Sequence, residues 1–169
     1  MNNMEDVTVK KVIGRRTGKY TNEEHLESLL VSNVWDIVDS TESDDPKKID
    51  LESYFEGMSI EFIVTIKLIL LSTLKVVDGK IDAKVFTVIN LLGSVSHLRR
   101  ALSTMNLRSS KEINENNVTK FFEVLVYKSD GGFYAKNTIR NSILKFLMES
   151  SRSDRTYPDG PSILVTWNM

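Results

Sequence analysis

Residues 57–77 read Gly-Met-Ser-Ile-Glu-Phe-Ile-Val-Thr-Ile-Lys-Leu-Ile-Leu-Leu-Ser-Thr-Leu-Lys-Val-Val and form the longest apolar stretch of the chain. Apolar side chains recur there at every second position, which in an extended chain places them on one face. They are Ile60, Phe62, Val64, Ile66, Leu68 and Leu70. The many β-branched residues also favour a strand. We therefore expect a long central strand over about residues 58–72. The length of the stretch also permits a buried helix, whereas Glu61 and Lys67 argue against a membrane span.

The composition is typical of one globular domain, because 41% of the 169 residues are hydrophobic and 27% are charged. Hydrophobic spacing and turn signals predict further elements on both sides of the central stretch. We expect helices over about 21–39, 82–102 and 138–147, strands over 121–127, 133–135 and 162–167, and turns at Asp78-Gly79 and at 129–132. The fold class is then α+β, with a small mixed or antiparallel sheet packed by three to four helices. This domain spans residues 21–169 and follows a flexible basic arm at residues 1–20.

Charge is strongly segregated along the chain, although the net charge is only −1. The balance is +3 in residues 1–20, −9 in residues 21–56 and +5 in residues 57–169. Residues 39–50 contain almost nothing to bury, and we expect them to form an exposed acidic loop. Its acidic side chains are candidates for self-association through head-to-tail contacts with basic surfaces of a second copy: Asp39, Glu42, Asp44 and Asp45. The alternatives are a solvated surface or neutralisation within one molecule.

Two groups of basic residues are candidates for binding an anionic surface, on RNA or on lipid headgroups. The first group lies in the arm and comprises Lys10, Lys11, Arg15, Arg16 and Lys19. The second group lies at and after the end of the helix expected over 82–102, and comprises Arg99, Arg100, Arg108 and Lys111. Compensation of the helix dipole is the alternative role for this second group.

The sequence lacks the usual signatures of catalysis, so we do not expect an enzyme. It contains no cysteine and only two histidines. Clustered metal ligands and a phosphate-cradling glycine pattern are both missing from the sequence. We expect no metal, no cofactor and no small-molecule substrate.

A basic arm, an acidic segment and an α+β domain with a long alternating strand together resemble the matrix proteins of rhabdoviruses, especially the short ones of plant-infecting, cytorhabdovirus-like members. Residues 60–68 resemble their first core strand, and the helical segment over 82–102 follows as it does there. The Pro-Pro-x-Tyr motif of the animal-virus proteins is absent. The resemblance implies a structural protein of the virion that self-associates, binds the ribonucleocapsid or its RNA, and lies peripherally on anionic membranes in the host cytoplasm.

Two other kinds of protein fit the same residues. One is a nucleic-acid-binding viral accessory protein, which would use the arm and the second basic group without membrane affinity. The other is a helical module that interacts with host proteins, in which residues 60–75 would be a buried helix.

Overall fold

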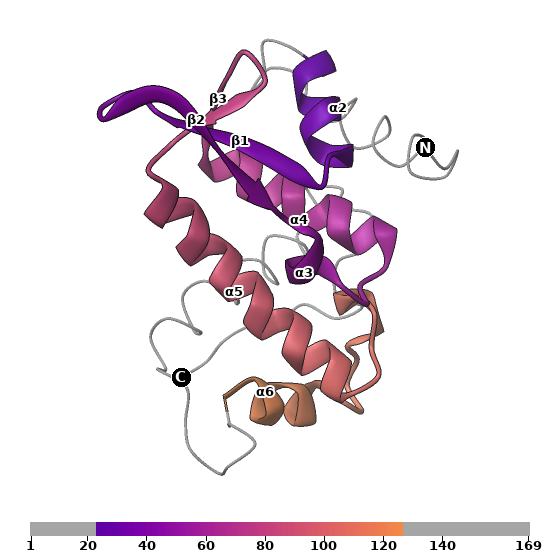
Figure 1. Ribbon diagram of the computed structural model, residues 1–169. Coiled ribbons are helices and arrows are strands. Elements are labelled where there is room, and N and C mark those ends of the chain that lie inside the picture. The colour runs from indigo at the N-terminus through magenta and orange to yellow at the C-terminus, as the bar shows by residue number, and fades with distance from the viewer. Residues whose placement is uncertain (1–22, 127–169) are drawn as a thin grey trace.

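The computed structural model describes residues 23–126, which form helices around a small sheet (Figure 1). The helices are α2 (Glu23–Val31), α3 (Glu52–Phe55), α4 (Ile60–Thr73), α5 (Val85–Thr104) and α6 (Val118–Val126), with a 3₁₀ turn η1 (Ser110–Glu112). The strands are β1 (Val34–Asp39), β2 (Ser43–Asp50), β3 (Lys75–Val77) and β4 (Lys80–Asp82). The order in the sheet is β2-β1-β4-β3; β1 and β4 are parallel and the two outer pairs antiparallel. The predicted α+β class with a small mixed sheet is confirmed.

The predicted long central strand is wrong, because Ile60–Thr73 is helix α4. Half of the residues between the alternating apolar positions are apolar too, namely Ile63, Ile69 and Leu71, so the stretch also fits a helix with apolar side chains on every side. Each residue from Val64 to Leu71 is buried. The helix begins where the Ser59 hydroxyl accepts a hydrogen bond from the Phe62 amide at 3.3 Å. Burial on all sides thus outweighs the strand preference of the β-branched residues.

Lys67 is the one cation within this buried helix, and its side chain is only 2% exposed. Its Nζ donates to the carbonyl oxygens of Leu30 at 3.0 Å and Ser32 at 2.9 Å, at the end of α2. The ammonium also lies 5.7 Å from the centre of the Phe55 ring. The last carbonyls of a helix lack partners within the helix and attract positive charge. Lys67 therefore joins α4 to the C-terminus of α2.

Trp35 satisfies a third carbonyl at the same helix end. Its indole Nε1 donates to the Leu29 oxygen at 2.8 Å, and the ring is fully buried. The helix predicted over 21–39 consequently ends at Val31, and the chain continues as strand β1. Ser32 supports this change of direction, because its hydroxyl donates to the Val34 oxygen and accepts from the Val34 amide.

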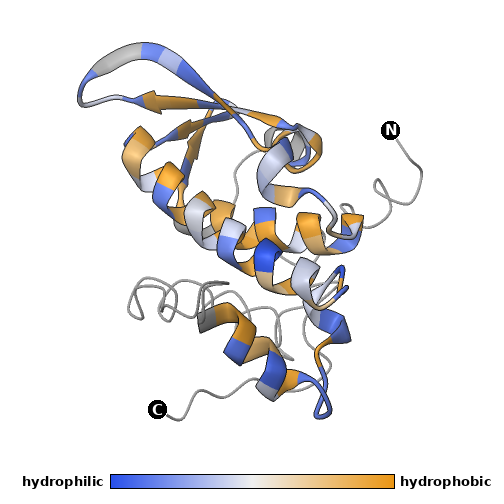
Figure 2. Cartoon of the chain, turned by 60° about the horizontal axis from the view of Figure 1, so that its bottom comes forward, coloured by the Kyte–Doolittle hydropathy of each residue, from blue (hydrophilic) through white to orange (hydrophobic). Residues whose placement is uncertain are grey.

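Most of the described side chains in the acidic segment at 39–50 are exposed, but most of the segment is strand β2 and not a loop. It pairs with β1 in a hairpin that projects beyond the helices in both views (Figures 1 and 2). The pairing register shifts between Ile37 and Asp39, opposite the part of β2 that contains Pro46. Edge strands tolerate proline at such irregular positions, and lysine side chains discourage further strand pairing.

The later elements agree with the sequence only in part. The Asp78-Gly79 turn is confirmed: it joins β3 to β4, and both residues have positive φ angles, 50° and 74°. The helix expected over 82–102 is α5, shifted to Val85–Thr104. The strand expected over 121–127 is wrong, because Val118–Val126 is helix α6. The elements expected over 129–167 and the basic arm lie outside the described residues.

Replacing Lys67 with methionine should lower the free energy of unfolding by about 2 kcal/mol. The buried Leu30 carbonyl and the partly buried Ser32 carbonyl would lose their donor, at a cost of about 1–3 kcal/mol each, partly offset because an ammonium is no longer buried. Urea unfolding followed by tryptophan fluorescence measures the change. Lys75→Met is the control, because the ion pair of Lys75 with Asp82 is exposed at the lysine and worth about 0–1 kcal/mol. Equal stability of the two variants would contradict this role of Lys67.

Val64→Asp and Thr65→Asp should be equally damaging, because the native residues are 3% and 0% exposed on one buried helix. Either change buries a carboxylate without a partner. Ile63→Asp should be milder, since Ile63 is only half-buried. Far-UV circular dichroism and the yield of soluble protein report the outcome. A folded Thr65→Asp variant beside an unfolded Val64→Asp variant would instead support the alternating strand pattern.

Candidate functional site

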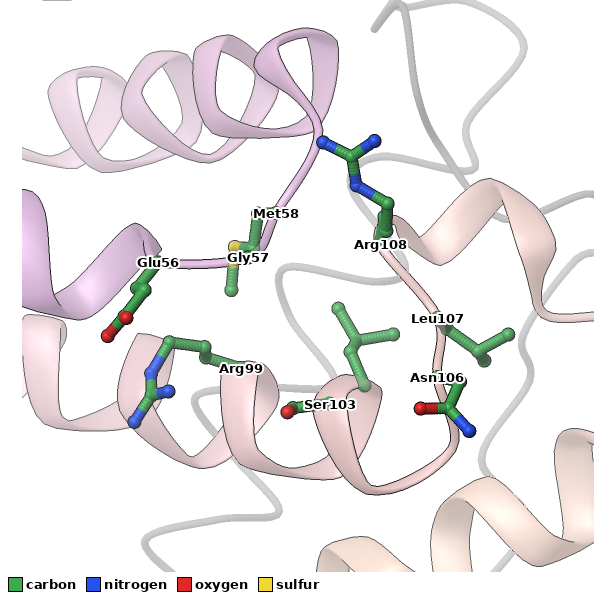
Figure 3. A pocket seen from close by; sticks show the side chains of 9 residues that line it. Glu56, Gly57, Met58, Arg99, Ser103, Asn106, Leu107 and Arg108 are labelled. Atoms are coloured by element: carbon green, nitrogen blue, oxygen red, sulfur yellow. The ribbon is translucent and has the colours of Figure 1, made fainter.

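A pocket of about 240 Å³ opens at the C-terminal end of α5 (Figure 3). The chain between α3 and α4 forms one wall, and the last turns of α5 with the residues after them form the other. Its lining comprises Glu56, Gly57, Met58, Arg99, Leu102, Ser103, Asn106, Leu107 and Arg108. The pocket therefore brings together Arg99 and Arg108, two of the residues predicted to bind anions.

The loop that carries Arg108 is held in place by several hydrogen bonds. Asn106 ends α5 in the left-handed region, with φ 57°. The Arg108 carbonyl accepts from the Ser59 amide at 2.9 Å, which ties this loop to the start of α4. The Glu112 carboxylate accepts from the Arg108 amide at 2.6 Å and from the Ser109 amide at 3.1 Å. The Arg108 side chain is thus presented from a fixed backbone.

The two arginine side chains lie on different sides of the pocket. Figure 3 shows Arg99 on the side where Glu56 projects, whereas Arg108 extends toward the chain that leads into α4. Arg99 is half-buried, and its Nε is buried without a hydrogen-bond partner among residues 23–126. Arg108 is exposed. Because the guanidinium groups do not converge on one point, the site suits an extended anionic segment better than a single small anion.

Arg100 has a different role from its neighbour. Its two terminal nitrogens each donate at 2.9 Å, one to the Val124 carbonyl and one to the Leu125 carbonyl. These carbonyls belong to the last turn of α6, where a cation is favourable. Arg100 thus binds carbonyls of α6, a contact that differs from the compensation of its own helix dipole considered from the sequence. Lys111 is exposed on η1 and does not line the pocket.

The acidic residues lie at the other end of α5, in the β1–β2 hairpin. Thr41 donates to Asp39 Oδ1 from its hydroxyl at 2.6 Å and from its amide at 3.0 Å. These hydrogen bonds hold the pKa of Asp39 below its usual value. Glu42 and Asp45 are exposed. Asp44 lies in β2, and the structure does not describe its side chain.

Asp82 anchors this hairpin tip to the sheet. Its Oδ1 accepts from the Ser40 hydroxyl at 3.0 Å, and its Oδ2 lies 3.1 Å from the Lys75 ammonium. The hydrogen bonds from Lys75 and Ser40 hold the pKa of the Asp82 carboxyl below its usual value. These contacts tie the hairpin tip to the sheet, and the lowered pKa values keep Asp39 and Asp82 ionised at mildly acidic pH.

The two charged sites are fixed on one body. The hairpin lies beside the start of α5, where Lys84, Val85 and Phe86 share a groove of about 150 Å³ with Asp39, Glu42 and Asp45. The arginine pocket lies at the end of the same helix. A helix of the 20 residues of α5 is about 30 Å long. The acidic and basic sites are consequently separated by about that distance.

Within residues 23–126, no group of three or more acidic or histidine side chains is placed to hold a metal ion. Helix length and hydropathy in the same part of the chain identify no membrane-crossing helix.

His97 is half-buried on α5. Burial lowers its pKa, and the nearby positive charge of Arg100 lowers it further.

Comparison of the chain with models of known protein families, with curated proteins and with solved structures gave no match. Residues 60–68, which carried the resemblance to a viral core strand, belong to helix α4.

The sequence did not identify the pocket residues that are not basic, above all Glu56 and Asn106. Asn106 lies just after the helix, where an asparagine with positive φ often ends it, and this signal could have placed the bend. No comparable signal pairs the 56–58 segment with the end of α5, because that contact depends on the tertiary fold.

Arg99→Gln and Arg100→Gln should separate binding from stability. Arg100→Gln removes two charged hydrogen bonds to α6 and should lower the free energy of unfolding by about 1.5–3 kcal/mol. Arg99→Gln should change it by less than about 0.5 kcal/mol, and should weaken binding of a single-stranded RNA oligonucleotide. Urea unfolding and fluorescence anisotropy measure the two effects. Equal loss of stability in both variants would contradict the division of roles.

Proposed function

We propose that this protein is a non-enzymatic structural protein that self-associates head to tail, with the acidic hairpin of one copy against the arginine pocket of the next. One observation carries the proposal: carboxylates and arginines occupy opposite ends of α5 within one folded unit. Within a single molecule the acidic hairpin and the arginine pocket cannot meet, because α5 separates them by about 30 Å.

The shapes of the two surfaces support the same contact. The hairpin projects from the body, so its acidic tip can enter a recess on another molecule (Figure 2). The pocket is lined by arginines at two separate positions, which matches the several carboxylates along the hairpin. Isolated exposed ion pairs contribute only about 0–1 kcal/mol each, so several must act together.

A contact between two different surfaces does not close on itself unless its rotation forms a ring. Repetition of the proposed contact therefore produces chains or filaments. Assembly of this kind is the behaviour expected of a matrix-type protein. The proposal here rests on the charge distribution, since residues 60–68 form a helix and not the core strand of the family resemblance.

A second candidate function is RNA binding at the basic end, and a specific observation favours it. Arg108 and Lys111 are both exposed and close in sequence, and Arg108 shares the pocket with the half-buried Arg99. With the basic arm, these residues would neutralise phosphates of a ribonucleocapsid. An anionic membrane surface is the other partner that such residues suit. RNA bound to Arg99 and Arg108 would compete with the acidic hairpin of a neighbouring copy.

Charge exchange between two variants tests the self-association. The first variant carries Glu42→Lys and Asp45→Lys in the hairpin, and the second carries Arg99→Glu and Arg108→Glu in the pocket. Each variant alone should remain monomeric at about 0.01 M salt, where the Debye length is about 30 Å. An equimolar mixture should assemble, because the altered hairpin of one variant matches the altered pocket of the other. Light scattering measures the association.

The matched control reverses two exposed acids elsewhere, Glu115→Lys and Glu123→Lys, and should assemble like the unaltered protein. Assembly of the unaltered protein should weaken as the Debye length falls to about 8 Å at 0.15 M salt. A monomer at every salt concentration would overturn the proposal. Loss of RNA binding by the pocket variant, with no change in association, would favour the second candidate.

A further inference from the structure

Among the large apolar side chains that the structure describes, Phe86 is the most exposed. It lies in the first turn of α5 and is 73% exposed, whereas Val34, Val77 and Ile89 are 43–46% exposed. Leaving an aromatic ring in water is unfavourable, and such rings are enriched in the buried centres of protein–protein contacts. Phe86 is therefore a candidate contact residue.

The groove beside Phe86 carries charges of both signs. Its lining includes three acidic and two basic side chains: Asp39, Glu42, Asp45, Lys47 and Lys84. The arginine pocket is mixed in the same way, because Glu56 lines it together with Arg99 and Arg108. The excess is acidic at the groove and basic at the pocket, which favours an approach of the two surfaces but does not identify what fills the pocket.

The lining of the arginine pocket suits an aromatic ring. Met58, Leu102 and Leu107 supply apolar side chains. Figure 3 shows the Met58 side chain extending toward α5. Thioether groups make favourable contacts with aromatic rings, and guanidinium groups such as that of Arg99 stack on the ring faces.

The size of the pocket also fits a ring. An apolar cavity of about 150 Å³ holds a benzene molecule. The arginine pocket measures about 240 Å³, so a phenylalanine side chain can enter it.

Phe86 cannot reach the pocket of its own molecule. Phe86 and Arg99 lie 13 positions apart on the same helix, which corresponds to about 20 Å along its axis. We propose that Phe86 of one copy inserts into the arginine pocket of the next copy, as the apolar anchor of the head-to-tail contact. This inference rests on the proposed function, because the acidic hairpin beside Phe86 brings the ring to the pocket.

The anchor gives the contact a part that salt does not screen. Exposed ion pairs weaken as the Debye length falls. Removal of a ring from water does not depend on that screening. Charge then sets the salt dependence of the contact, and Phe86 adds affinity at every salt concentration.

Two variants that can form only one contact isolate the anchor. The donor keeps its hairpin and Phe86 and carries Arg99→Gln with Arg108→Gln. The acceptor keeps its pocket and carries Glu42→Gln, Asp45→Asn and Phe86→Ser. The mixture should form a one-to-one complex, because neither variant can extend the chain further. Sedimentation velocity at about 0.01 M salt measures its Kd.

Phe86→Ala in the donor should weaken this complex by about tenfold or more, with an unchanged salt dependence. The control is Val77→Ala, which removes another exposed apolar side chain that lines neither site and should leave the Kd unchanged. Ser103→Phe in the acceptor fills the pocket and should weaken the complex as much. Phe86→Ala should then have no further effect, because both changes remove the same contact.

Far-UV circular dichroism should show folded variants, because Phe86 and Ser103 are exposed. Cysteine cross-linking gives a direct readout, since the native chain contains no cysteine. Phe86→Cys in the donor and Ser103→Cys in the acceptor should form a disulfide between the two chains on mild oxidation. Val77→Cys in the donor should react with the same acceptor much more slowly, and equal rates would contradict the insertion.

The anchor and the proposed self-association can fail separately. An unchanged Kd for Phe86→Ala would overturn the anchor and leave the self-association standing. A complex that needs Phe86 but does not respond to salt would support the anchor and overturn the electrostatic part of the proposed function. No complex at any salt concentration would overturn both.

Discussion

The buried ammonium of Lys67 is the constraint on which the arrangement of this domain depends. A charge within an apolar helix is costly unless it meets strong acceptors. The end of α2 supplies two carbonyls, at Leu30 and Ser32, and the indole of Trp35 takes a third at Leu29. The end of α2, the middle of α4 and the start of β1 are thereby fixed against one another. A shift of α4 along its axis by one turn would leave both the charge and the carbonyls unsatisfied.

The position of α4 then determines what surrounds it. Because α4 is buried along most of its length, α2 and the sheet must cover it, and its start must stay tied to the loop at Arg108. That tie places the arginine pocket at one end of α5, while the parallel pairing of β1 with β4 places the hairpin at the other. The separation of the acidic hairpin from the arginine pocket is therefore a consequence of core packing, although neither of these charged sites lies in the core.

The sequence predicted those features that local chemistry determines. The Asp78-Gly79 turn, most of α5 and the exposure of the acidic segment all follow from residue types and spacing. Features that depend on distant partners were not predictable. The residues of α4 satisfy both a strand and a helix period, and only cover on every side decides between them. Strand β2 has almost no apolar alternation, and it forms because β1 offers a backbone to pair with.

The different roles of Arg99 and Arg100 also depend on distant partners and could not be predicted from the sequence. Arg99 and Arg100 are adjacent and chemically identical, yet successive helical residues point about 100° apart. Arg99 lines a pocket, and Arg100 joins α5 to α6. The strand predicted over residues 121–127 would not have presented two unpaired carbonyls to Arg100. The end of a helix does so, because its last carbonyls lack partners within the helix. A mistaken secondary-structure element therefore changes the function assigned to a residue more than twenty positions away.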